Sequence, residues 1–156
     1  MKLLEVLALI VFLCACEKAP QAVLADARRD LDDGDYAEAI EAADEGLRRA
    51  QDGAISWGLE LVKLEAHARA GEGAAAKAQL EKLARLHPER IPASEYSATA
   101  HQLQQAGQGP AAIEVLDLGL KLHPGDELIG RMIGASASAG SDPAELKMLR
   151  SLGYIE

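Results

Sequence analysis

The chain has 156 residues, which is enough for one domain of ordinary size and too few for two. Only 3% of the residues are aromatic and no alternating β-branched run occurs, so the composition favours an all-α fold. The formal net charge is −9 and no basic stripe is present, which argues against a protein that binds a nucleic-acid backbone.

The first twenty residues differ from the rest. A positive charge at Lys2 is followed by an unbroken apolar run over residues 6–16. A membrane-spanning helix needs about 20 apolar residues, whereas a run of this length is typical of the core of a signal peptide. The sequence therefore predicts a signal peptide over residues 1–15.

The end of this run, Leu13-Cys14-Ala15-Cys16, resembles a bacterial lipoprotein signal. A small residue at Ala15 would let the peptidase approach the bond, and the thiol of Cys16 would receive the diacylglycerol. Cleavage there would remove Cys14, the chain's other cysteine, so we expect no structural disulfide. The resemblance implies a lipidated tether over residues 16–20 and a periplasm-facing, lipid-anchored protein of the bacterial envelope; a buried cysteine pair or an uncleaved anchor is the alternative.

Helical patterns follow in chain order, each bounded by turn residues. We expect Ser94 to cap the fifth helix, and Asp142 followed by Pro143 to begin the last one, because Asp is a favoured cap and Pro a favoured first residue. The predicted ranges are 21–33, 36–51, 54–70, 74–87, 94–106, 110–123, 126–139 and a short helix from 142.

The helices recur in pairs. His87-Pro88 and His123-Pro124 lie 36 residues apart, and glycines mark the chain at positions 34, 71, 107 and 140. A repeat of this length that holds two helical patterns predicts a stacked array of helical hairpins. The expected domain covers residues 21–156, with units at about 21–53, 54–91, 92–125 and 126–156.

The third unit resembles a tetratricopeptide (TPR) repeat, in which large apolar, small and proline positions recur at fixed spacing. The residues that carry this resemblance are Tyr96, Thr99, Ala100, Leu103, Ala112, Leu116 and Pro124. The second unit matches with one interval a residue short, the first also lacks the closing proline, and the fourth fits least well. The resemblance covers roughly residues 20–140. It implies a right-handed α-solenoid of about 3.5 TPR-like hairpins with a C-terminal capping helix, which is a scaffold architecture.

In the TPR family the first helix of each hairpin lines a concave face that generally binds peptides. The resemblance therefore implies a partner-binding groove whose polar side chains suit an extended peptide, or else a merely solvated surface. The groove residues carried over are Arg29, Arg69, Ser97, His101, Gln104 and Gln105. The family's clamp for a terminal carboxylate uses Lys and Asn, and this chain contains no Asn.

No catalytic motif stands out in the sequence. The chain lacks a zinc-binding histidine pattern, a nucleophile elbow and a phosphate loop, so we expect no catalysis, no cofactor and no metal. His87 and His123 end corresponding helices, where the helix dipole favours a positive imidazole. Trp57 is expected to pack between repeats or, as the alternative, to anchor a bound partner. The small face at Gly130 and Gly134 is expected to receive the last helix.

These patterns predict a membrane-tethered scaffold that binds a protein or peptide, such as an envelope assembly component, on its concave face. The alternative is a structural envelope component that self-associates through its acidic first repeat or apolar last repeat and has no peptide ligand. The acidic first unit would then be a docking surface rather than a solvated cap.

Overall fold

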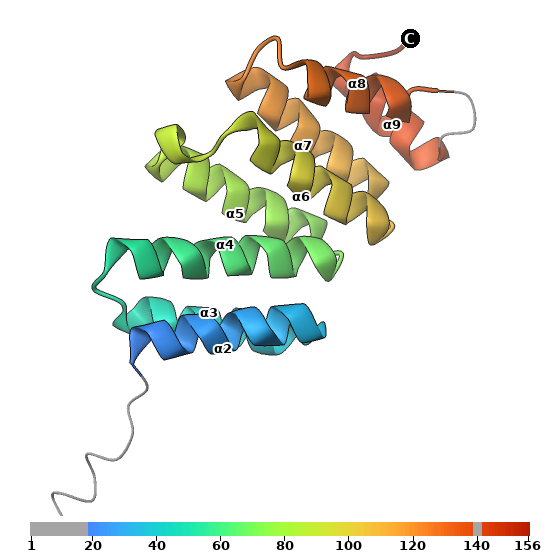
Figure 1. Cartoon of the computed structure of the whole chain (residues 1–156). Coiled ribbons are helices and arrows are strands. Elements are labelled where there is room, and N and C mark those ends of the chain that lie inside the picture. Colours follow the sequence, from blue (N-terminus) through green and yellow to red (C-terminus); the bar gives the residue numbers. More distant parts are fainter. Residues whose placement is uncertain (1–18, 139–141) are drawn as a thin grey trace, which may run out of the picture.

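The computed structural model describes residues 19–138 and 142–156, and within these ranges the chain is all-α (Figure 1). The predicted signal peptide, Cys16 and Gly140 lie outside the described residues. In these two described ranges, eight α-helices and one short 3-10 helix follow one another: α2 (Pro20–Asp33), α3 (Tyr36–Arg49), α4 (Gly53–Arg69), α5 (Gly73–Leu86), η1 (Pro88–Arg90), α6 (Ala93–Gln105), α7 (Gly109–Leu122), α8 (Glu127–Ser136) and α9 (Pro143–Leu152).

The helix boundaries confirm most of the predicted ranges. Asp142 caps α9, because its Oδ1 atom accepts a hydrogen bond from the Ala144 amide at 2.7 Å. The prediction for Ser94 is wrong: α6 begins one residue earlier, after Pro92, and no side chain caps it. Pro92 is extended at ψ 163°, so the chain enters the helix at Ala93 and Ser94 already lies within the first turn.

The turns inside the first three hairpins share one geometry. A glycine with positive φ ends each first helix, at +87° for Gly34 and +75° for both Gly71 and Gly107. The amide after each glycine donates to the carbonyl five residues earlier, which satisfies a carbonyl that the helix end would leave free. These hydrogen bonds are Asp35 to Asp30 at 2.8 Å, Glu72 to His67 at 2.9 Å and Gln108 to Leu103 at 2.8 Å.

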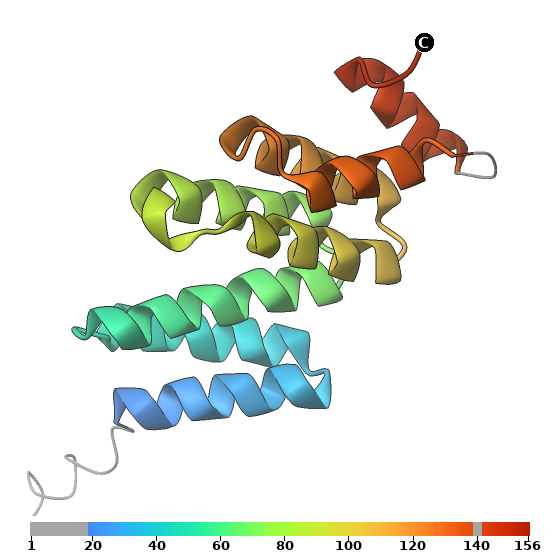
Figure 2. The same cartoon turned by 45° about the horizontal axis from the view of Figure 1, so that its top comes forward.

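The helices pack as consecutive antiparallel pairs, consistent with a helical-hairpin array (Figures 1 and 2). We call α2, α4, α6 and α8 the A helices, and α3, α5, α7 and α9 the B helices. Each A helix contacts the next A helix, and α7 lies between α5 and α9. The array therefore has a face formed by A helices.

The last helix continues the row of B helices. A Cβ atom added at Gly73, the first residue of α5, would collide with Ala111 of α7, and one added at Gly109 of α7 would collide with Glu145 of α9. The expectation that α9 packs on Gly130 and Gly134 is wrong, because nothing lies within 4 Å of a Cβ added at either glycine. Instead, α9 packs against α7, and Leu149 of α9 is fully buried.

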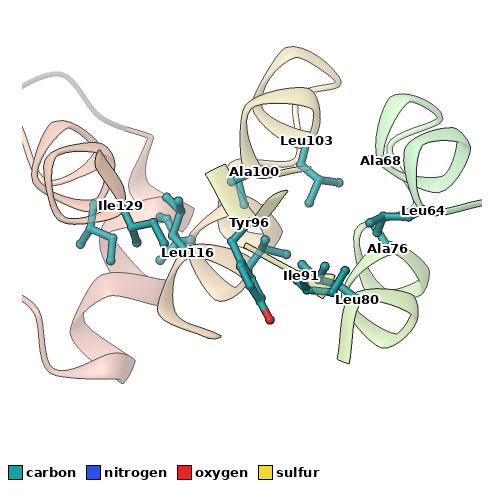
Figure 3. Packing of buried hydrophobic residues seen from close by; sticks show 14 of the residues in the cluster. Leu64, Ala68, Ala76, Leu80, Ile91, Tyr96, Ala100, Leu103, Leu116 and Ile129 are labelled. Carbon is teal, nitrogen blue, oxygen red and sulfur yellow. The ribbon is translucent and has the colours of Figure 1, made fainter. Parts of the chain in front are cut away.

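The core divides along α4. Leu59 and Val62 belong to a cluster shared with α2 and α3, whereas Leu64 and Ala68 belong to a larger cluster that runs through α5, α6, α7, α8 and α9. Figure 3 shows part of the larger cluster, with Tyr96 among its labelled residues. Because α4 buries residues on two sides, it joins the first hairpin to the rest of the array.

Candidate functional site

A hollow of about 510 Å³ opens where the last turns of α4 and α6 lie close together. Arg69 is the last residue of α4 and Gln105 the last of α6, and adjacent A helices run in the same direction, so their C-terminal ends meet at one edge (Figure 1). The residues that line the hollow are Tyr36, Arg69, His101, Gln102, Gln105 and Ala106.

Arg69 links two A helices. Its Nη2 atom lies 2.7 Å from Oε1 of Glu65, one turn earlier in α4. Its Nη1 atom donates to the backbone oxygen of Leu31 at 3.5 Å, near the C-terminal end of α2. That carbonyl carries the partial negative charge of a helix terminus, which favours the guanidinium. With the Arg69 side chain about one third exposed, a ligand can still reach it.

The network continues into α6. Gln102 donates from Nε2 to Oε1 of Glu65 at 3.3 Å. The same Glu65 oxygen pairs with the Arg69 guanidinium, so Glu65 contacts both side chains. On the adjacent turn, Nε2 of Gln105 lies 3.0 Å from Nε2 of His101, and both side chains are exposed. The hollow therefore presents one guanidinium, one imidazole and two amides from two neighbouring repeats.

Glu65 also affects the pKa of Glu95, which lies in the first turn of α6. Burial raises the pKa of Glu95 above its ordinary value, and the negative charge of Glu65 raises it further. Glu65 lines a second hollow of about 290 Å³, together with Arg28 and Asp32 of α2. The A-helix face thus carries two neighbouring hollows with carboxylate and guanidinium groups between them.

Three of the six predicted groove residues share the larger hollow: Arg69, His101 and Gln105. Ser97 does not line the hollow; it is only 6% exposed, and its hydroxyl donates to the Ala93 carbonyl at 3.4 Å. Gln104 lies outside the hollow.

Arg29 also lies outside it. Its guanidinium is 3.1 Å from Asp26 and 3.6 Å from Asp30, both on its own helix.

Sequence reasoning missed Tyr36, Gln102 and the bridging Glu65. Tyr36 begins α3, a B helix, whereas the TPR resemblance implies a groove lined by A helices alone. The sequence signal that could have placed Tyr36 in the hollow is its position after the turn at Gly34. That turn brings the start of α3 to the edge where Arg69 ends α4.

The predicted helix-end histidines contact aromatic rings. His87 follows α5 and meets the Trp57 ring edge-on at a centroid distance of 5.6 Å, while His123 follows α7 and lies 5.5 Å from the Tyr96 ring. The Arg90 guanidinium lies 4.0 Å from the centre of the Trp57 ring. Trp57 thus contacts the segment that follows α5, and these contacts lie within the second unit.

Comparisons with known proteins return no match among family models, curated proteins or solved structures. No helix within residues 19–138 and 142–156 has both the length and the apolar character needed to cross a membrane. Over the same ranges, no group of three or more His, Cys, Asp or Glu residues is placed to hold a metal ion.

Proposed function

We propose that this chain is a non-catalytic scaffold of the TPR type, tethered to a bacterial envelope membrane through a lipidated Cys16. Its A helices form the concave face of a right-handed α-solenoid and bind a segment of a partner protein. The hollow shared by Arg69, His101 and Gln105 is the observation that carries this proposal.

The chemistry of the hollow suits an extended peptide. Amide and imidazole groups from α6 can hydrogen-bond a peptide backbone, and Arg69 can pair with an acidic side chain. Arg69 and Gln102 are already held by Glu65, so the donors are positioned before a ligand arrives. Preorganised side chains lose less conformational entropy on binding, which favours affinity.

The sequence resemblance supports the same function. The recurring turn glycines and the row of contacting A helices fit a TPR-like array, in which such a face is the usual peptide-binding surface. The partner expected from this setting is a protein of an envelope assembly.

The test is capture of a partner by the tagged full chain from solubilised envelopes. The double variant Arg69→Ala with His101→Ala removes two polar contacts, each contributing about 1 kcal/mol, so the captured amount should fall by roughly tenfold or more. Arg85→Ala is the matched control, since Arg85 is exposed on α5, outside the hollow. Equal capture by the double variant and the wild type would contradict a ligand site in this hollow.

The alternative, self-association without a peptide ligand, makes a different prediction. Sedimentation of the purified chain alone should then show an assembly whose size grows with concentration. Incorporation of a labelled lipid precursor into the wild type, with loss in Cys16→Ala, tests the tether separately.

A further inference from the structure

The exposed large hydrophobic side chains gather at one edge of the array. In the part of the chain that the structure describes there are three: Leu86 at 55% exposure, Leu122 at 51% and Leu128 at 45%. All three lie where a B helix gives way to the next A helix. We define the B-to-A edge as the last two residues of each B helix through the first two of the next A helix, residues 48–54, 85–94 and 121–128.

The position of these leucines follows the repeat. Leu86 is the last residue of α5 and Leu122 the last residue of α7, so the same place in successive units carries the same exposed side chain. Leu128 lies just beyond, in the first turn of α8. Arg90, which belongs to this edge, lies 4.0 Å from the centre of the Trp57 ring, and a tryptophan with a cation is a pairing suited to a membrane–water interface.

The B-to-A edge differs in charge from the opposite edge. The B-to-A edge holds five basic residues and four acidic ones. Asp52 and Asp126 among the acids accept hydrogen bonds from helix amides. Arg48, Arg49 and Lys121 among the bases pair with a carboxylate on their own helix. The opposite A-to-B edge, defined in the same way as residues 32–37, 68–74 and 104–110, holds one basic residue and four acidic ones. An anionic bilayer surface attracts basic residues and repels acidic ones, so it discriminates between the two edges.

The chain also enters the array at the B-to-A edge. Because α2 is an A helix, its N-terminal end lies at the same side as the α3–α4, α5–α6 and α7–α8 junctions (Figures 1 and 2). The first residue of α2 is Pro20. Cys16 precedes Pro20 by four residues, a stretch that spans at most about 14 Å when fully extended. A lipid on Cys16 would therefore hold this edge close to the bilayer.

We propose that the B-to-A edge lies on the membrane, with Leu86, Leu122 and Leu128 inserted at the boundary between headgroups and acyl chains. This inference rests on the proposed lipidation of Cys16. A short tether gives the edge an effective concentration on the order of mM at the surface, so that insertion too weak to recruit a free domain still orients an anchored one.

The orientation has a consequence for the partner site. Arg69, Gln105 and Tyr36 all lie at helix ends on the A-to-B edge. With the leucines on the bilayer, the hollow faces away from the membrane and toward a partner in the aqueous compartment.

Trp57 is the chain's single tryptophan and reports on this edge. The chain with lipidated Cys16 is reconstituted into phosphatidylethanolamine–phosphatidylglycerol vesicles that contain acyl-brominated lipids, which quench tryptophan only at the bilayer. We expect quenching of Trp57 in the wild type and loss of that quenching in the double variant Leu86→Glu with Leu122→Glu.

The matched control is the double variant Ala74→Glu with Gln108→Glu. It adds the same charge in the same two units, at exposed positions on the A-to-B edge, and should keep the wild-type quenching. Circular dichroism of each variant verifies that the helices remain folded.

Each outcome separates the tether from the edge. If mass spectrometry finds no lipid on Cys16, the proposed anchor fails and the membrane orientation fails with it. If Cys16 is lipidated but Trp57 is unquenched, or is quenched equally in the leucine variant, the anchor stands and the edge proposal is overturned. If Trp57 is unquenched in the wild type and the leucine variant captures less of a partner protein, this edge is a protein interface. That outcome also overturns the proposal.

Discussion

Gly107 and Gly130 have the same side chain but different backbone conformations. Gly107 ends α6 at φ +75°, whereas Gly130 lies within α8, and nothing lies within 4 Å of a Cβ added at either one. A methyl group would therefore fit equally well at the two positions, and only the backbone conformation distinguishes them. The left-handed conformation disfavours any residue with a Cβ atom, while a helix interior disfavours glycine.

Gly107→Ala should lower the free energy of unfolding by about 1–2 kcal/mol, and Gly130→Ala should raise it by about 0.5–1 kcal/mol. Urea unfolding of the two variants beside the wild type measures both effects. Shifts of the same sign would contradict this explanation of the turn.

Tyr154 ties the C-terminal segment to α7. Its hydroxyl donates to Oδ1 of Asp117 at 2.9 Å, and burial followed by this carboxylate raises the pKa of Tyr154 from 10.0 to about 12. The folded state therefore keeps the phenolic proton to higher pH than the unfolded state does. The resulting stability is complete below pH 10 and is lost as the pH rises from 10 toward 12.

Tyr154→Phe should remove this contribution and lower the free energy of unfolding at neutral pH by about 1–2 kcal/mol. Because burial also raises the pKa of Tyr96, the relevant measurement is the difference between wild type and variant across the alkaline range. A difference that stays constant from pH 9 to about pH 12 would show that the Tyr154 proton is not held by the fold.

At the scale of the elements, α4 joins the two core clusters. Leu59 is fully buried in the cluster of the first hairpin and packs over Gly46 of α3, where a Cβ atom would lie 2.7 Å from Leu59 Cδ1. Leu103 is equally buried in the larger cluster. In repeat arrays each unit contacts only its neighbours, so damage to one cluster should spread incompletely.

Leu59→Ala and Leu103→Ala should each cost about 2–5 kcal/mol, because each leaves a cavity. Hydrogen exchange should accelerate most in α2 and α3 for Leu59→Ala, and most in α6 and α7 for Leu103→Ala. Equal acceleration throughout both variants would indicate a single cooperative unit.

The elements also show where local signals are sufficient. The turn glycines predict the ends of α2, α4 and α6, because a left-handed residue is required there whatever packs nearby. The sequence predicts Ser94 as the cap of α6, but the cap position is Pro92, two residues earlier, since a proline and a serine both signal a helix start. The packing position of α9 could not be predicted, because it depends on the close contact between Glu145 of α9 and Gly109 of α7.

At the scale of the whole molecule, the site depends on how neighbouring units align. Arg69 and His101 come from different repeats, and their meeting at one hollow follows from the contact between α4 and α6. Ser97 belongs to the same helix as His101 but is buried, because a small rotation about the helix axis moves a residue from the surface into the core. Tyr36 reaches the hollow from a B helix, which family analogy with A-helix grooves did not predict.

The sequence alone determined the all-α class, the mid-thirties period and the helix limits to within a few residues. Those features arise from hydrophobic periodicity, glycine conformation and proline geometry, which are local in the chain. Only the tertiary structure decided which polar side chains share a hollow, where α9 packs and which edge carries the exposed leucines. These outcomes depend on contacts between residues far apart in sequence, and a repeat pattern fixes the order of such contacts without fixing the rotation of each helix against its neighbours.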